Sequence, residues 1–409
     1  MGKIARRPHP TTRIEYIDGL RALAVLSVLV SHIVLHSPNL QSGLAYRLGM
    51  EGAHGVDLFF VLSGFCLAFP TLQKYRRGLA DGFGIGDFAV KRLVRIVPPF
   101  FLATFAFVSL AIAGRASGHG ASIPLPPPGD LLKSLLFLDG RVQLINGSFW
   151  TLMVEFRWYF LFPVLLVVWL RSPRAFCAIG VGCAVLYALT RARGLDLGTL
   201  PGFMTGIVAA DVFVGARMRP DVARFIKRYA LLLLVPCVAA GIAVESNATI
   251  PGFNGADVAW PYQPTIIGWQ LAMFFFVVAA GEAAWLRRAL SLRALVATGI
   301  ASYAIYLVHE PIVGTIVNRL HGPVAYGAAA AVTLAAGFAF WYVAERPFTT
   351  GSLRRPLLDG IRPAVRRCFA WTGVPDRVAL PQYVQWQDPA PAPRPADRLP
   401  DLRFLPENA

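Results

Sequence analysis

Long apolar stretches recur along almost the whole chain, and they constrain its fold more than any other feature. A membrane-spanning helix needs about 20 mostly apolar residues, with a range of roughly 17–25. Ten stretches meet or approach this length, and they lie at residues 19–37, 54–70, 97–113, 149–170, 175–190, 202–216, 229–244, 265–284, 295–317 and 323–343. The fifth and sixth are short. The sequence therefore predicts an all-α, polytopic membrane helical bundle with about ten transmembrane helices.

The composition excludes a soluble or disordered protein. Hydrophobic residues make up 56% of the 409 residues and charged residues 15%, whereas soluble domains contain about 45–50% and roughly 25%. Disorder would require low hydrophobicity. The five cysteines are scattered and include no Cys-x-x-Cys pair, so they indicate neither a disulfide framework nor a metal site.

Basic residues between the apolar stretches predict the orientation. The net charge of +16 is compatible with binding to nucleic acid or to a membrane surface. If the N-terminus is cytoplasmic, the large majority of the Lys and Arg residues between the stretches fall on the cytoplasmic side, as the positive-inside rule requires. We therefore expect both termini in the cytoplasm, the lipid bilayer as a partner, and no nucleic acid.

The sequence divides into three parts. We expect a cytoplasmic N-terminal segment at 1–18, a membrane domain at 19–348 and a cytoplasmic C-terminal region at 349–409. Residues 352–369 form a basic stretch that could lie on anionic lipid. Residues 375–409 are rich in Pro and Asp, which predicts a disordered tail.

Ionisable side chains within the apolar stretches identify candidate functional residues. A charge inside the bilayer costs about 2.5–3.5 kcal/mol on insertion scales, so such residues usually face the bundle interior and serve a function. Arg21 and His32 lie eleven residues apart in the first stretch. Eleven steps of about 100° return to one face of a helix, with a rise of about 16 Å. An interfacial arginine and a hydrogen-bonded interior histidine would explain each residue alone, but their shared face favours a joint role.

Three carboxylates lie in other stretches. Asp57 is expected about one turn below the outer surface, where a helix dipole alone could favour it. Glu155 lies about two turns into a helix that we expect to begin at 146–148, with Ser148 as its capping residue. A buried carboxylate needs a partner, and histidine is a natural one. Asp211 is a further buried carboxylate for which the sequence suggests no partner.

Polar residues also share one face of the ninth stretch, because Ser302, Tyr306 and His309 recur at helical spacing. The expected orientation puts the histidines and the carboxylates Asp57 and Glu155 in the outer half of the membrane. The cations at the inner face are Arg21, Lys91, Arg92 and Arg95. Such a cationic group suits a phosphate-bearing ligand, and a deep histidine with carboxylate neighbours suits general base catalysis.

Six short motifs follow one another in the chain: Asp18-Gly19-Leu20-Arg21-Ala22 with His32, Gly55–Phe65, Lys91–Pro98, Ser148–Glu155, Ser302–His309 and Glu345-Arg346-Pro347. With these motifs the sequence resembles the acyltransferase-3 family of integral membrane O-acyltransferases, from about residue 13 to residue 348. The resemblance implies ten helices and an enzyme of the bacterial inner membrane. The implied reaction moves an acyl group, with acetyl as the expected one, from acyl-CoA to a hydroxyl of a carbohydrate such as a surface polysaccharide or lipopolysaccharide.

The resemblance also implies roles for individual residues. Acyl-CoA is a substrate here, and no permanently bound cofactor or metal is expected. The catalytic group would be His32, with Glu155 or Asp57 orienting its ring. The expected CoA-binding residues are Arg21, Lys91, Arg92 and Arg95, and the expected acceptor-side or supporting residues are Trp150, Ser302, Tyr306 and His309.

Two features depart from the family pattern. Glu310 follows His309 where a less acidic residue is expected, and no hydrolase-like domain follows the tenth stretch, so we expect the reaction to be completed within the membrane part. Direct transfer and a covalent acyl relay both remain open, as does the oligomeric state. The alternative function is a proton-coupled transporter or flippase, because buried Asp, Glu and His also form proton relays; inverted repeats typical of transporters are not evident. A silent membrane scaffold would leave the shared face of Arg21 and His32 unexplained.

Overall fold

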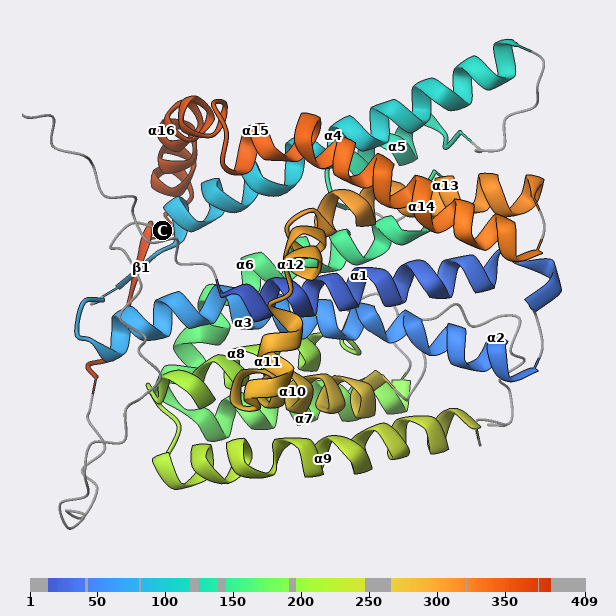
Figure 1. Ribbon diagram of the computed structural model, residues 1–409. Coiled ribbons are helices and arrows are strands. Elements are labelled where there is room, and N and C mark those ends of the chain that lie inside the picture. The colour runs from blue at the N-terminus through green and yellow to red at the C-terminus, as the bar shows by residue number, and fades with distance from the viewer. Residues whose placement is uncertain are drawn as a thin grey trace, which may run out of the picture.

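The computed structural model describes residues 14–40, 43–80, 82–117, 125–138, 145–190, 196–246, 266–320, 322–373 and 375–383. As predicted, the described residues are mostly helical, and most of the long helices run roughly parallel to one another (Figure 1). The long helices are α1 (Glu15–Leu35), α3 (Gly55–Arg76), α4 (Ile85–Ala116), α6 (Trp150–Arg171), α7 (Pro173–Thr190), α8 (Leu200–Val214), α9 (Pro220–Ser246), α10 (Ile266–Glu282), α13 (Ser302–Arg319) and α14 (Gly322–Phe340).

Shorter elements connect or extend these helices. They are η1 (Pro38–Leu40), α2 (Gly43–Met50), η2 (Glu51–His54), β1 (Gly82–Gly84), α5 (Pro128–Leu135), η4 (Gly147–Phe149), α11 (Ala284–Leu290), α12 (Arg293–Ile300), the π-helical η6 (Trp341–Glu345), α15 (Arg346–Thr349), α16 (Arg354–Thr372) and β2 (Arg377–Ala379).

Apolar helices long enough to cross a membrane number six among the described residues, or eight if each of two bent pairs forms one span. The pair α10–α11 bends by 97° and the pair α12–α13 by 75°. The break between α12 and α13 divides the stretch 295–317, which the sequence predicts as one continuous helix. Two further apolar helices, Pro173–Tyr187 and Leu200–Val214, are shorter. Apart from one pair of short strands, the described residues therefore form a helical membrane protein.

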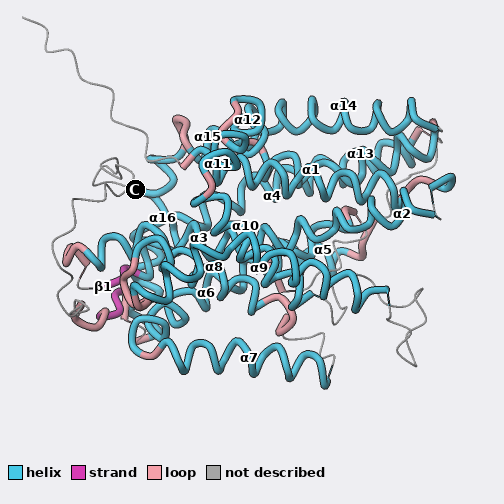
Figure 2. Tube along the Cα trace, turned by 60° about the horizontal axis from the view of Figure 1, so that its bottom comes forward, coloured by secondary structure: helices cyan, strands magenta, loops and turns pink. Residues whose placement is uncertain are grey.

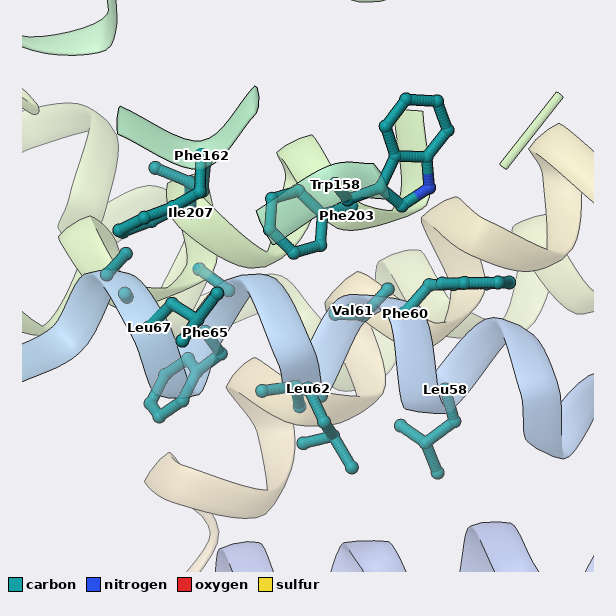
Figure 3. Packing of buried hydrophobic residues seen from close by; sticks show 14 of the residues in the cluster. Leu58, Phe60, Val61, Leu62, Phe65, Leu67, Trp158, Phe162, Phe203 and Ile207 are labelled. Atoms are coloured by element: carbon teal, nitrogen blue, oxygen red, sulfur yellow. The ribbon is translucent and has the colours of Figure 1, made fainter. Parts of the chain in front are cut away.

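The centre of the bundle is formed by α1 and α3, together with α8. Gly64 of α3 and Gly206 of α8 allow the two backbones to touch, because a Cβ on either residue would lie 2.0 Å from a carbonyl oxygen of the other helix. Small residues permit such close approach between membrane helices. Around this contact, Phe203 and Ile207 pack beside α3 (Figure 3). The close contact fixes the position of α3, and α3 in turn carries part of the candidate site.

Asp211, for which the sequence suggested no partner, has a structural role. Its carboxylate accepts hydrogen bonds from Trp169 Nε1 at 3.0 Å and from the backbone N–H groups of Ala216 and Met218 at 2.5 and 2.8 Å. The chain turns there through Gly215, whose φ of +64° is in the left-handed region. Asp211 therefore stabilises the turn that ends α8.

The region after α15 packs back onto the helical bundle. Leu358 of α16 contacts Val90 and Val94 of α4, and β2 pairs in antiparallel orientation with β1. Figure 2 shows this strand pair at one end of the molecule. Residues 375–383 of the expected tail are therefore structured in part, and residues 384–409 lie outside the described part of the chain.

Candidate functional site

Two groups of polar side chains lie along α1, which is one continuous helix from Glu15 to Leu35. We call His32, Ser148, His309 and Glu310 the histidine cluster, and Arg21, Arg92 and Arg95 the arginine cluster. Because α1 is unbroken, Arg21 and His32 share the face that their spacing predicts.

The hydroxyl of Ser148 is the centre of the histidine cluster. It donates a hydrogen bond to Glu310 Oε2 at 2.6 Å, and Ser148 Oγ lies 3.2 Å from His309 Nε2 and 3.5 Å from His32 Nε2. The two imidazole rings meet edge to face, with their centroids 4.8 Å apart. His32 Nε2 also lies 3.7 Å from Glu310 Oε2. Three helical segments far apart in the sequence thus contribute to one cluster.

Backbone carbonyls fix the tautomer of both histidines. His32 Nδ1 lies 2.9 Å from the carbonyl oxygen of Val28, and His309 Nδ1 lies 2.7 Å from that of Tyr306. A carbonyl oxygen can only accept, so each Nδ1 carries the hydrogen, and Nε2 of each neutral ring is an acceptor. Two Nε2 atoms and one carboxylate oxygen therefore face a single hydroxyl hydrogen. The cluster has more acceptors than donors, and the hydroxyl of a substrate would supply a donor.

The backbone before α6 holds Ser148 in place. The side chain of Asn146 accepts from the N–H of Ser148 at 3.0 Å and donates to the carbonyl of Leu307 at 2.9 Å. Asn146, and not Ser148 as the sequence suggested, therefore provides the cap, which leaves the Ser148 hydroxyl to the cluster. Gly147 has no room for a side chain, because a Cβ there would lie 2.4 Å from Glu310 Oε1.

Tyr306 and Thr151 support the same turn. The hydroxyl of Tyr306 donates to the carbonyl oxygen of Ser148 at 3.1 Å and lies 2.8 Å from Thr151 Oγ1. One turn beyond His32, the ring of His36 lies 6.4 Å from that of His32.

The three guanidinium groups of the arginine cluster lie close enough to Cys66 of α3 to interact electrostatically with its thiol. Arg92 lies over the rings of Phe88 and Tyr159, at 5.5 and 5.9 Å from their centroids. Its Nε atom is buried and has no hydrogen-bond partner. Burying a cation without full hydrogen bonding is costly, and an anionic ligand would complete the site.

The carboxylates near the arginine cluster interact with arginines of the cluster or accept hydrogen bonds from neighbouring side chains. Arg21 lies 4.0 Å from Asp18 Oδ1, and Arg95 interacts electrostatically with Glu345 and Glu155. Glu155 in turn accepts hydrogen bonds from Tyr159 at 2.6 Å and from Ser63.

A stripe on α3 connects the two clusters. Between His54 and Phe69 every residue is buried except Phe59, Ser63 and Cys66, whose spacing of four and three residues places them on one face. Phe59 packs edge to face on Tyr306 at 5.8 Å, Ser63 bonds Glu155, and Cys66 interacts electrostatically with the arginine cluster. This face of α3 therefore contacts residues of both clusters and of their surroundings.

The structure separates some residues that the sequence grouped together. Glu155 was expected beside His32, but it lies with Tyr159 and the arginine cluster. Asp57 lies 2.9 Å from His54 Nδ1, and Gln270 donates to its second oxygen at 3.4 Å. The Nδ1 of His32, which one of these carboxylates was expected to hold, is bonded to the Val28 carbonyl instead.

The remaining candidates, Lys91, Ser302 and Trp150, have different surroundings. Lys91 pairs with Asp87 at 2.9 Å, and Asp87 also binds Arg362 of α16. Ser302 is buried at the start of α13, with no hydrogen-bond partner for its hydroxyl. Trp150 is half-buried at the first residue of α6.

Sequence reasoning missed the central role of Ser148 and noticed Glu310 only as a departure. The available signal was the position of Glu310 next to His309, directly before Pro311. No comparable signal marked the Val28 carbonyl, because every residue type presents the same backbone carbonyl.

Comparisons with known proteins bear on this arrangement. Residues 14–344 match a family model, Acyl_transf_3, described as an acyltransferase domain. The chain is 23% identical over 330 residues to the peptidoglycan O-acetyltransferase OatA of Listeria monocytogenes. The aligned region covers 73% of this chain and 49% of that protein. It thus spans about half the length of that relative.

Two further relatives are matched over most of their length. The exopolysaccharide production protein ExoZ of Rhizobium meliloti is 27% identical over 328 residues, covering 76% of this chain and 93% of that protein. The acyltransferase MdmB of Streptomyces mycarofaciens is 28% identical over 323 residues, covering 74% and 79%. No solved structure matches the chain.

Proposed function

The chain belongs to the acyltransferase-3 family of O-acyltransferases, and from that premise we propose that it transfers an acetyl group from acetyl-CoA to a hydroxyl of a cell-surface carbohydrate. The observation that carries the proposal is the excess of hydrogen-bond acceptors in the histidine cluster, His32 Nε2 among them, which suits the hydroxyl of an incoming carbohydrate. The names of the relatives refer to peptidoglycan and exopolysaccharide, so a polysaccharide of the bacterial envelope is the proposed acceptor class, with lipopolysaccharide as a further member.

The donor would bind at the arginine cluster. One guanidinium group can donate two parallel hydrogen bonds to a phosphate. Arg92 Nε is buried and has no hydrogen-bond partner. We place this end at the cytoplasmic face of the bacterial inner membrane, where acyl-CoA is available, with ten spans and both termini in the cytoplasm. The accessible stripe formed by Phe59, Ser63 and Cys66 supports a path along which the pantetheine arm would reach His32.

His32 would act as the general base. With its Nδ1–H bonded to the Val28 carbonyl at 2.9 Å, Nε2 is free to accept the proton of the acceptor hydroxyl, whose oxygen then attacks the acyl carbonyl. The Glu310 carboxylate, 3.7 Å from Nε2, would stabilise the imidazolium that forms. A positioned general base typically contributes a rate factor of about 10²–10⁴.

The experiment uses the full chain in detergent, acetyl-CoA labelled in the acetyl group, and soluble peptidoglycan or exopolysaccharide fragments as acceptors. We expect release of CoA together with alkali-labile O-acetyl esters on a glycan, measured by mass spectrometry. His32→Ala should lower the rate by about 10² or more while CoA binding is kept. Ser37→Ala removes a buried hydroxyl that donates to the Ile33 carbonyl of α1 and serves as the matched control.

Two results would contradict the proposal: glycan acetylation by His32→Ala at the rate of the unmodified protein, or no acetylation of any envelope glycan by the unmodified protein. The transporter alternative predicts substrate movement driven by a gradient and no CoA release, so the same assay in detergent separates the two functions.

A further inference from the structure

We propose that Ser148 carries the acyl group as a covalent ester between the donor and the acceptor. This inference rests on the proposed function and deepens it, because the sequence leaves direct transfer and a covalent relay equally open. The geometry that distinguishes them is the convergence of three acceptors on the Ser148 hydroxyl.

Direct transfer requires one base beside the acceptor hydroxyl, and His32 meets that requirement. It gives no reason for a second imidazole beside a serine, or for a serine hydroxyl that donates its hydrogen bond to the Glu310 carboxylate. Ser148 Oγ lies 2.6 Å from Glu310 Oε2 and 3.2 Å from His309 Nε2. A hydroxyl hydrogen-bonded to a carboxylate, with an unprotonated nitrogen beside it, is an activated nucleophile.

The position of Ser148 also suits an intermediate that must survive until the acceptor arrives. The residue is 2% exposed, so bulk water has little access to an ester there. The side chains of His32 and Glu310, which contact its hydroxyl, are 20% and 18% exposed. The serine can therefore be approached from the side of these two residues while it remains shielded elsewhere.

In the first half-reaction, Ser148 Oγ attacks the thioester carbonyl and its proton moves to Glu310 Oε2, to which it is already hydrogen-bonded. The C–S bond then breaks, and the CoA thiolate takes that proton from Glu310. The products are the acetyl ester of Ser148 and CoA with a free thiol, and Glu310 is again ionised.

In the second half-reaction, the acceptor hydroxyl gives its proton to His32 Nε2 and its oxygen attacks the carbonyl of the serine ester. As the ester C–O bond breaks, the proton passes from His32 Nε2 to Ser148 Oγ, which lies 3.5 Å away. The products are the O-acetylated glycan and the original serine. Each base returns to its starting state, and CoA can leave before the acceptor binds.

The first test omits the acceptor. The full chain is incubated with acetyl-labelled acetyl-CoA, denatured and digested, and the label is located by mass spectrometry. We expect a hydroxylamine-labile label on the peptide that contains Ser148, none on that peptide in Ser148→Ala, and an unchanged label in Ser37→Ala. A label on Thr151 or another nearby side chain would contradict the assignment.

The second test needs no variant, so it holds even if Ser148→Ala fails to fold. A covalent relay makes the first half-reaction reversible without acceptor, so isotopically labelled CoA should exchange into unlabelled acetyl-CoA. Absence of exchange in a preparation that acetylates glycan would overturn the relay and leave the proposed function standing. Glycan acetylation by folded Ser148→Ala at the unmodified rate would do the same, whereas failure of the unmodified protein to acetylate any glycan would overturn the proposed function itself.

Discussion

The arginine cluster and the histidine cluster each include one residue of α1, Arg21 and His32, and they differ in how their polar atoms are held. In the histidine cluster, both Nδ1 atoms donate to backbone carbonyls at 2.9 and 2.7 Å, and the Ser148 hydroxyl donates to Glu310. In the arginine cluster, Arg92 rests on aromatic rings and its Nε has no partner.

This difference indicates two tasks. Groups held by short hydrogen bonds to the backbone are preorganised, and preorganisation is what chemistry at a reacting atom requires. Cations with incomplete hydrogen bonding gain most from an anionic ligand. The comparison therefore assigns catalysis to one cluster and ligand binding to the other, and each assignment can be tested by variants that should affect only one of them.

The largest effect on binding is expected at the arginine cluster. Arg92→Ala should weaken CoA binding by tenfold or more, because a hydrogen bond to a charged group contributes about 1.5–3 kcal/mol. Arg92→Lys should restore part of the affinity, since it keeps the charge and loses the paired donors. Isothermal calorimetry with CoA measures both, and unchanged affinity in Arg92→Ala would break the division between the clusters.

A smaller effect, confined to the reaction rate, is expected at Gly147. A Cβ in Gly147→Ala would lie 2.4 Å from Glu310 Oε1, and the flexible carboxylate would move away from Ser148. We expect kcat to fall by about tenfold, as for the loss of one charged hydrogen bond, with CoA affinity unchanged. Gly182→Ala on α7, where a Cβ meets no atom within 4 Å, is the control. A loss of CoA affinity in Gly147→Ala would show that the clusters are not separable.

Helical periodicity predicted the relationship between Arg21 and His32 because that relationship lies within one uninterrupted helix. The same reasoning failed for Glu155. Its face on α6 could be derived, but its neighbours depend on how α6 is rotated and shifted against α3 and α4, and those packing relations join residues far apart in the sequence. Glu155 consequently lies near Arg95 and not beside a histidine.

Other features were out of reach for a more basic reason. The Val28 carbonyl holds His32, and any residue type at position 28 would present the same group. The 75° bend between α12 and α13 occurs inside the stretch 295–317, where Gly299 stands next to small and β-branched residues. Ser148 was expected to cap a helix because Ser is a frequent cap, and only the structure shows that Asn146 takes that place.

Cys66 offers a chemical probe of the space beside the arginine cluster. Its side chain is exposed and interacts electrostatically with all three arginines. We expect bound CoA to slow its alkylation by a maleimide several-fold, roughly in line with the occupancy of the site. Cys368 on α16, also exposed, should react at the same rate with or without CoA. Equal protection of both thiols, or of neither, would remove the support that the α3 stripe gives to a donor path.

The smallest effect is expected at Lys91, which is adjacent in sequence to Arg92 and carries the same charge. Its ammonium group pairs with Asp87 at 2.9 Å, and Asp87 also binds Arg362 of α16. Exposed ion pairs contribute about 0–1 kcal/mol, so Lys91→Gln should change CoA affinity by less than about twofold, while Arg92→Gln on the same helix should weaken it by about tenfold. Calorimetry on the two variants in parallel checks whether CoA affinity depends on the position of the cation or only on its charge. If both lose affinity equally, the anion site is wider than the arginine cluster and extends along the face of α4 toward α16.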